Sequence, residues 1–176
     1  MLDAGLGYPA LAEKGLEAAK RYAKIAPAAP DAQHMPSHIF TRVGYWNDSI
    51  ASNKKSARVG KEGGEQHDLA HAMDCLVYAC LQLAQDKEVR TVVDELTKLD
   101  FKIERFPGPY AVAASQARYV FERGDWKAAA ELQVRPTKYL YVDAITYFGW
   151  QSVQLALVTQ KRRRPISPIL SPCAIS

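Results

Sequence analysis

The sequence predicts an all-α fold made of stacked helical hairpins. Apolar and small residues recur at helical spacing along most of the 176 residues, while the alternating runs typical of strands are scarce. Three helix–turn–helix units also recur at a spacing of about 40 residues, marked by Gly44-Tyr45-Trp46, Ala84-Gln85-Asp86 and Gly124-Asp125-Trp126. One helical hairpin cannot bury its own apolar face, so neighbouring hairpins have to stack, and this repeat indicates a helical solenoid.

The helices follow one another with short connections. In chain order, we expect them over residues 9–25, 36–43, 46–57, 68–85, 87–98, 109–123, 126–133 and 138–160. Proline and glycine mark the predicted stops, at Pro27 and Pro30, Gly60 with Gly63-Gly64, Pro107-Gly108-Pro109, Gly124, and Pro136. The prediction is one domain over residues 1–160, with hairpins at about 36–58, 68–98 and 109–134 and flanking helices, followed by a basic, proline-containing tail over 161–176 that we expect to be disordered.

Equivalent positions of the three units carry similar residues. Five residues after the start of each turn the chain has a small or β-branched residue, and four residues before it an apolar one. The first set is Ser49, Val89 and Ala129, and the second is Phe40, Cys80 and Val120. We expect Ala129 to be buried in the third hairpin.

Composition and charge exclude several classes of protein. The chain is 48% hydrophobic with a net charge of +4, which is typical of a globular domain and not of a disordered chain. Lys161-Arg162-Arg163-Arg164 alone supplies four positive charges, so the body is neutral and nucleic-acid binding is not expected. No apolar stretch approaches the roughly 20 residues of a membrane helix. The first residues lack the pattern of a secretion signal, so we expect a cytoplasmic chain.

The three cysteines do not predict a disulfide framework or a thiolate metal site. Cys75 and Cys80 lie five residues apart in an apolar run, and Cys173 is in the tail. This spacing lacks the paired CxxC pattern that such sites use. We expect reduced, buried thiols.

The turn segments resemble the tetratricopeptide-repeat family. Gly44-Tyr45-Trp46-Asn47-Asp48-Ser49-Ile50 and Gly124-Asp125-Trp126-Lys127-Ala128-Ala129 are similar to that family's turn and the start of its second helix. The period of about 40 residues is longer than the ~34 usual in the family. The resemblance implies a right-handed superhelix whose first helices line a concave surface.

A closer resemblance is to bacterial repeat proteins of mostly uncharacterised role. It runs through Tyr22-Ala23-Lys24-Ile25-Ala26-Pro27, His34-Met35-Pro36-Ser37-His38-Ile39-Phe40, Trp46 to Asn53 and Leu76 to Gln82. The likeness covers about Tyr8 to Phe148. Relatives carry further repeats upstream, including a His-rich helix, so we expect the chain to be a fragment. Truncation of a solenoid exposes apolar end faces, which predicts self-association.

The four histidines form two pairs with a spacing of four residues, His34 with His38 and His67 with His71. Residues four apart share one face of a helix, and two imidazoles placed in this way can bind one metal ion. Pro36 lies between the first pair, which favours a pre-helical turn for His34, where this geometry is not assured. His67 is expected in a loop. Structural histidines or a polar ligand-binding patch are the alternatives to a metal site.

The predicted function is a non-catalytic scaffold that binds a protein or peptide in a concave groove. No GxSxG, P-loop, HExxH or Rossmann motif is present, so we expect no catalysis and no cofactor. The alternative is a metal-binding protein, and possibly a metal-dependent hydrolase, that uses His34, His38 and His71 to hold zinc or another transition metal. Mapped onto the repeat, the residues expected to contact a ligand are His34, His38, Arg42, His71, Asp74, Tyr78 and Arg118, with Glu122 nearby.

Overall fold

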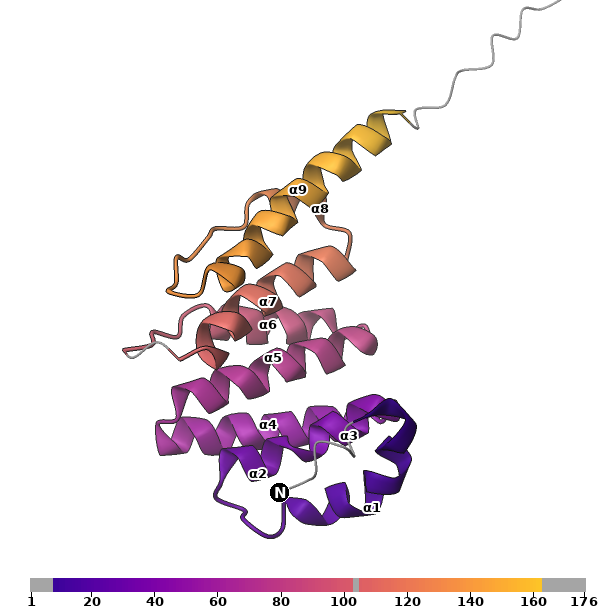
Figure 1. Cartoon of the computed structure of the whole chain (residues 1–176), viewed down its shortest axis with the longest axis vertical. Helices are drawn as coiled ribbons and strands as arrows, with labels where there is room; N and C mark the ends of the chain where they lie inside the picture. The colour runs from indigo at the N-terminus through magenta and orange to yellow at the C-terminus, as the bar shows by residue number, and fades with distance from the viewer. Residues whose placement is uncertain (1–7, 103–104, 163–176) are drawn as a thin grey trace, which may run out of the picture.

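A computed structural model describes residues 8–102 and 105–162, and within these ranges it contains helices and no strand (Figure 1). The predicted all-α class is confirmed. A short 3-10 helix precedes the α-helices. In order, the elements are η2 (Pro9–Leu11), α1 (Ala12–Tyr22), α2 (Pro30–His34), α3 (Pro36–Arg42), α4 (Trp46–Gly63), α5 (Gln66–Gln82), α6 (Asp86–Leu96), α7 (Pro107–Glu122), α8 (Trp126–Ala130) and α9 (Leu140–Arg162).

The helices stack roughly in chain order along the long axis of the molecule (Figure 1). α5 is central and packs against α4, α6 and α7, while α7 in turn packs against α9. The largest apolar cluster lies among α4, α5, α6 and α7, and Val77, Val89, Leu96 and Ala111 are completely buried there. None of the described helices is long and apolar enough to cross a membrane.

Four of the connections between helices use the same backbone turn. In each, a residue with positive φ follows the helix, and the next amide donates a hydrogen bond five residues back, which is the Schellman arrangement. The positive-φ residues are Gly44, Gly64, Ala84 and Gly124. The long hydrogen bonds run from Tyr45 to Phe40 (2.8 Å), Glu65 to Gly60 (2.8 Å), Gln85 to Cys80 (3.0 Å) and Asp125 to Val120 (2.9 Å).

The equivalent positions of the three sequence units are buried. Ser49, Val89 and Ala129 are completely inaccessible, each in the helix that follows a turn. The helix that precedes each turn also contributes a buried residue, and these are Phe40, Cys80 and Val120. The apolar residue before each turn is thus the acceptor of the long hydrogen bond, which explains its constant distance from the turn.

Gly60 does not end a helix, and this prediction was wrong. α4 continues to Gly63, and Gly60 lies inside it, where a Cβ atom would stand 3.1 Å from the backbone nitrogen of Leu69. A glycine that looks like a helix stop in the sequence here allows α4 and α5 to approach closely.

Pro30 does not mark a stop either. It is the first residue of α2, where its missing amide hydrogen removes no helical bond. Met35 has helical dihedral angles (φ −50°, ψ −37°), so α2 leads into α3 with little interruption. His34 is therefore helical and not part of a pre-helical turn, which corrects the expectation drawn from Pro36.

Other helix limits also differ from the predictions. The first expected helix, over 9–25, is divided into η2 and α1 and ends at Tyr22. α8 is one short turn ending at Ala130, whereas a helix to residue 133 was expected. Residues 163–176 of the predicted tail lie outside the described residues.

Candidate ligand-binding face

Three histidines from three helices meet in one cluster. His34 comes from α2, His38 from α3 and His71 from α5. The ring centroid of His34 lies 4.6 Å from that of His38 and 4.5 Å from that of His71, and the Nε2 atoms of His34 and His38 are 2.9 Å apart. One ring nitrogen from each histidine lies within 4.8 Å of those of the other two. The convergence expected from the repeat is present in the structure.

Asn53 of α4 fixes the ring of His34. Nδ1 of His34 lies 2.8 Å from Oδ1 of Asn53, and the Asn53 amide nitrogen donates to the Ser49 carbonyl oxygen at 3.0 Å. Both Asn53 and Ser49 are completely buried. Because the Asn53 amide nitrogen donates to Ser49, the Asn53 oxygen accepts a hydrogen bond from Nδ1–H of His34. Sequence reasoning missed Asn53, although a polar residue one turn after the inward-facing Ser49 is a signal for it.

The His34 ring is held in its neutral form. Burial, together with the neighbouring charges that His71 and His38 would carry, lowers the pKa of His34 to about 4. Although part of the His38 side chain is exposed, neighbouring atoms remove water from around its ring and lower the pKa of His38, with contributions from His71 and Arg42. At neutral pH both rings therefore carry no charge and have one nitrogen lone pair each.

A second polar group lies between α5 and α7. The Asp74 carboxylate accepts hydrogen bonds from the Ser115 hydroxyl (3.0 Å) and from Nη1 of Arg118 (2.5 Å). The Arg118 guanidinium carbon lies 5.4 Å from the centre of the Tyr78 ring, whose other neighbour is Trp46 at 5.8 Å. Asp74 is buried, so its role is to hold Arg118 in place.

The predicted contact residues thus fall into two groups. His34, His38 and His71 form the histidine cluster, and Asp74, Tyr78 and Arg118 form the polar group on α5 and α7. Arg42 lies in the last turn of α3, close enough to lower the pKa of His38. Burial raises the pKa of Glu122, which receives a hydrogen bond from Gln82 at 3.3 Å.

His67 is not in a loop, contrary to the prediction. It lies in the first turn of α5, which begins at Gln66. Its ring stacks on Phe101, with centroids 4.9 Å apart and an angle of 21° between the planes. The turn at Gly64 starts α5 earlier than the sequence pattern suggested, and aromatic packing is what places this histidine.

Both described cysteines have strongly raised pKa values. Burial raises the pKa of Cys75 to about 12 and that of Cys80 to about 11, and the nearby carboxylates of Asp74 and Glu88 add to this effect. Neither is in a disulfide. Both therefore remain protonated thiols at neutral pH and are poor metal ligands. Cys173 lies outside the described residues.

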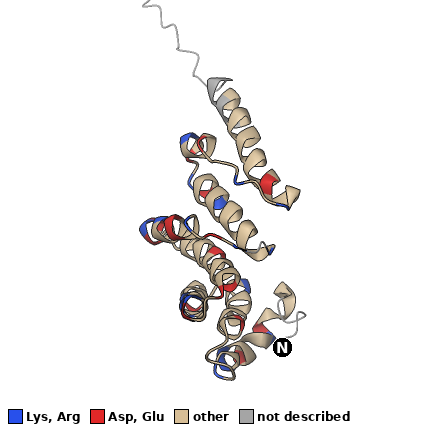
Figure 2. Ribbon diagram, turned by 90° about the vertical axis from the view of Figure 1, so that its left-hand side faces the viewer, with Lys and Arg blue, Asp and Glu red and all other residues tan. Residues whose placement is uncertain are grey.

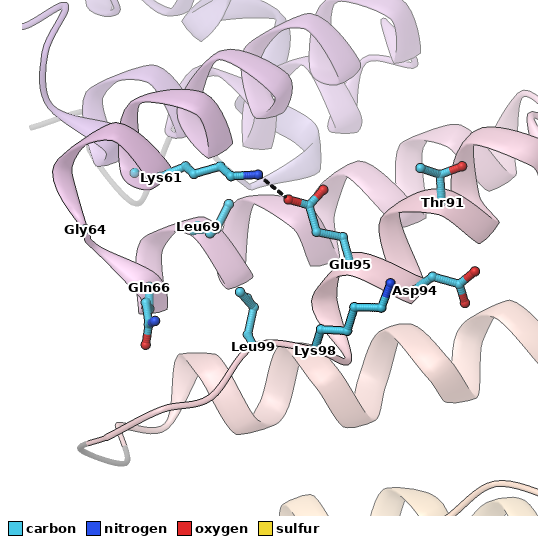
Figure 3. Close-up of a pocket in the computed structure, with 10 residues that line it drawn as sticks. Lys61, Gly64, Gln66, Leu69, Thr91, Asp94, Glu95, Lys98 and Leu99 are labelled. Carbon is cyan, nitrogen blue, oxygen red and sulfur yellow. Dashed lines mark hydrogen bonds and ion pairs between the residues drawn. The ribbon is translucent and has the colours of Figure 1, made fainter.

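Two hollows lie away from the predicted contact residues. A groove of about 650 Å³ runs between the end of α4, the start of α5 and α6, and the Lys61–Glu95 ion pair (2.7 Å) crosses it (Figure 3). A cavity of about 120 Å³ lies between α7 and α9, with Arg135 and Asp143 among its lining residues. The sequence pattern gave no sign of either, because each combines segments from different repeats.

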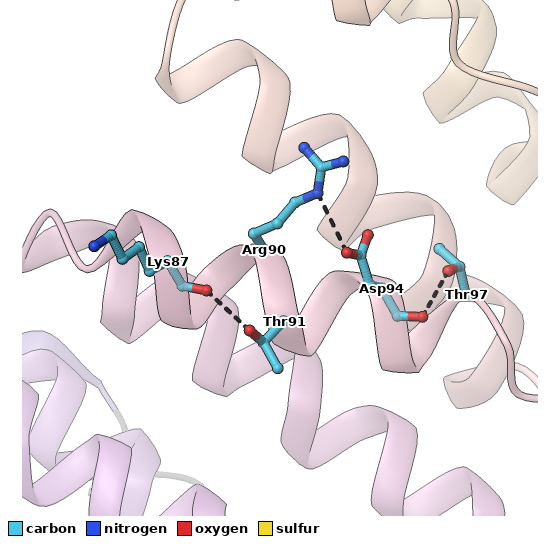
Figure 4. Close-up of polar contacts among 5 residues, drawn as sticks. All are labelled: Lys87, Arg90, Thr91, Asp94 and Thr97. Atoms are coloured by element: carbon cyan, nitrogen blue, oxygen red, sulfur yellow. Dashed lines mark hydrogen bonds and ion pairs between the residues drawn. The ribbon is translucent and has the colours of Figure 1, made fainter.

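Several exposed polar side chains of α6 make contacts within that helix (Figure 4). Arg90 pairs with Asp94 at 3.3 Å, and the Thr91 and Thr97 hydroxyls donate to backbone carbonyls of the same helix. Such exposed contacts within one helix contribute little to stability and indicate a solvated surface. We therefore do not assign this face to a ligand.

Comparisons of the chain with protein-family models, curated proteins and solved structures found no match.

Proposed function

We propose that the chain is a tetratricopeptide-like scaffold, with its hairpins in a right-handed superhelix, that binds a protein or peptide without catalysing a reaction. The binding surface is the face formed by α3, α5 and α7, and its ligand offers a carboxylate to Arg118. The fixed position of Arg118 is the observation that supports this proposal most directly. The residues that carry the resemblance to the repeat family support the choice of class.

Arg118 is prepared to bind an anion. Within the described residues, Arg118 donates hydrogen bonds only through Nη1, to the carbonyl and carboxylate oxygens of Asp74. Its side chain is 24% exposed, and the Tyr78 ring supports the guanidinium group. A guanidinium group held in this way still has donors on Nη2 and Nε for a carboxylate. Binding costs little side-chain entropy because the group is already ordered.

Selection from a library of random displayed peptides tests the proposal. We expect the enriched peptides to share an acidic residue or a required free carboxyl terminus. Their affinity for an Arg118→Lys variant should fall about tenfold, because Lys keeps the charge near Asp74 but loses the planar fork that binds a carboxylate. Fluorescence anisotropy with synthetic peptides measures this change.

Arg123→Lys is the matched control. Arg123 lies at the C-terminal end of α7, but it pairs with Asp86 on α6. This variant should bind the selected peptides like the wild type. Failure to enrich any peptide, or equal affinity of the two variants, would contradict the proposal, and thermal melting of both variants excludes unfolding as the cause.

A further inference from the structure

We propose that His34, His38 and His71 form a binding site for one divalent transition-metal ion, with zinc as the best fit. This inference does not depend on peptide binding. It rests on the convergence of three imidazoles from three helices, on the orienting contact from Asn53, and on the distances among the ring nitrogens.

Asn53 fixes the tautomer of His34. Oδ1 of Asn53 accepts a hydrogen bond from Nδ1–H of His34, so Nε2 of His34 carries the lone pair and faces His38. A second hydrogen-bonding group that fixes the tautomer of a coordinating imidazole is a regular feature of metal sites. Asn53 is itself fixed by Ser49, whose hydroxyl lies 3.1 Å from that of Thr41. A chain of three buried or half-buried polar residues, Asn53, Ser49 and Thr41, therefore orients the His34 ring.

The distances among the ring nitrogens are close to those among the ligands of one zinc ion. Two nitrogen ligands of a tetrahedral zinc ion lie about 3.3 Å apart, given zinc–nitrogen distances of about 2.0 Å. The Nε2 atoms of His34 and His38 are 2.9 Å apart, and all three candidate nitrogens lie within 4.8 Å of one another. With Nε2 of His34 as the acceptor, Nε2–H of His38 is the donor in this contact, so an ion can bind both Nε2 atoms only after that proton moves to Nδ1 of His38.

Charges of both signs surround the histidine cluster. Asp31 precedes His34 by three residues on α2, and Asp68 precedes His71 by three residues on α5, so each carboxylate shares a helix face with a histidine. The positive charge of Arg42 and the negative charge of Asp31 both act on His38, with opposite signs, and Asp68 interacts with His71. Imidazole nitrogens select zinc, copper, nickel or cobalt over magnesium and calcium. Three protein ligands also leave one coordination position for water or a ligand group.

Titration of the untagged full-length chain with zinc chloride or cobalt chloride tests the site. After removal of bound metal with a chelator, calorimetry should show one ion per chain. His38→Ala and His71→Ala should each raise the dissociation constant at least tenfold, and Asn53→Ala should raise it by about tenfold to 100-fold. Cobalt should give the intense visible absorption of a four-coordinate ion, which scattered surface binding does not produce.

His67→Ala is the matched control, since this histidine lies on α5 near His71 but packs against Phe101. It should leave the affinity and the cobalt spectrum unchanged. His38 is exposed and His71 half-buried, so their variants are expected to fold, and circular dichroism checks this. The site is refuted if the wild type binds zinc no better than the His38→Ala/His71→Ala double variant, or if His67→Ala weakens binding equally. Peptide affinity measured with chelator present keeps this result separate from the proposed scaffold function.

Discussion

His34 is the residue through which the histidine cluster joins the buried polar core. Its ring meets those of His38 and His71, and its Nδ1 lies 2.8 Å from Oδ1 of Asn53. Asn53 was not predicted because it lies 19 residues beyond His34 on another helix, and its contact depends on how α2 packs on α4. Spacing along a helix reveals which residues share a face. It does not reveal which buried polar residue of a neighbouring helix meets them.

Acid should destabilise the metal-free protein through His34. The pKa is about 4 in the folded chain, and about 6.5 is expected when the chain is unfolded. Between these values the unfolded state binds more protons, so the free energy of unfolding falls as the pH is lowered. His34 should account for a loss of roughly 3 kcal/mol over this window. Urea unfolding at several pH values, with chelator present, measures the slope.

A His34→Gln variant isolates this contribution, because glutamine does not titrate while the carboxylates remain the same. The variant should lose a large part of the dependence on pH between about 6.5 and 4. An unchanged slope would show that His34 is not buried as a neutral ring.

At the scale of the element, the shared turn explains the repeat better than any single motif. Gly44, Gly64 and Gly124 occupy the positive-φ position, and Ala84 occupies it in the fourth turn with φ 52°. An L-residue in this conformation costs about 1 kcal/mol or more, because its Cβ approaches the carbonyl oxygen. Ala84 is exposed, so its methyl group adds no packing in return.

Ala84→Gly should therefore stabilise the chain by about 1 kcal/mol, measured by urea unfolding. Gly124→Ala should have the opposite effect, since it introduces the same strain at the equivalent position. No atom lies within 4 Å of the Cβ that Gly124→Ala adds, so a steric clash does not contribute to the change in stability. A destabilised Ala84→Gly variant would contradict this account of the turn.

These turns also show why some helix limits were predictable and others were not. Gly44, Ala84 and Gly124 were found because similar residues flank them at a constant spacing. The predicted helix stops at Gly60 and Pro30 were wrong because each residue type has two structural roles. Glycine permits a positive φ at a helix end, but it also permits a close contact between helices. Proline can end a helix, but it can also begin one. Only the packing of α4 on α5, or of α2 on α4, decides between the two uses.

At the scale of the whole molecule, α9 is the last helix that the structure describes, and several of its large apolar side chains are exposed. Charged residues of both signs are spread over the earlier helices, whereas α9 has none between Asp143 and Lys161 (Figure 2). Phe148 is 66% exposed and Leu155 69% exposed. The exposed stripe alternates spacings of three and four residues, which is the pattern of a helix–helix seam, and consists of Tyr141, Ala144, Phe148, Gln151, Leu155 and Val158.

We expect a second copy of the chain to cover this stripe. Light scattering at high concentration should then give about twice the 19.6 kDa mass of the chain, and Phe148→Glu should return it to a monomer. Ala130→Glu, an exposed substitution on α8, is the control and should leave the association unchanged. A wild-type protein that remains monomeric would rule out this use of α9.

The stacking order has a consequence for the time course of synthesis. The main helix contacts in the described part of the chain join elements no more than three places apart, as with α2 and α5. At about 5 to 20 residues per second, a ribosome needs roughly 3 to 11 s to add residues 107–162. Helical units with local contacts fold in milliseconds or less. The histidine cluster, whose three rings all come from the first half of the chain, can therefore assemble while the last helices are still being made.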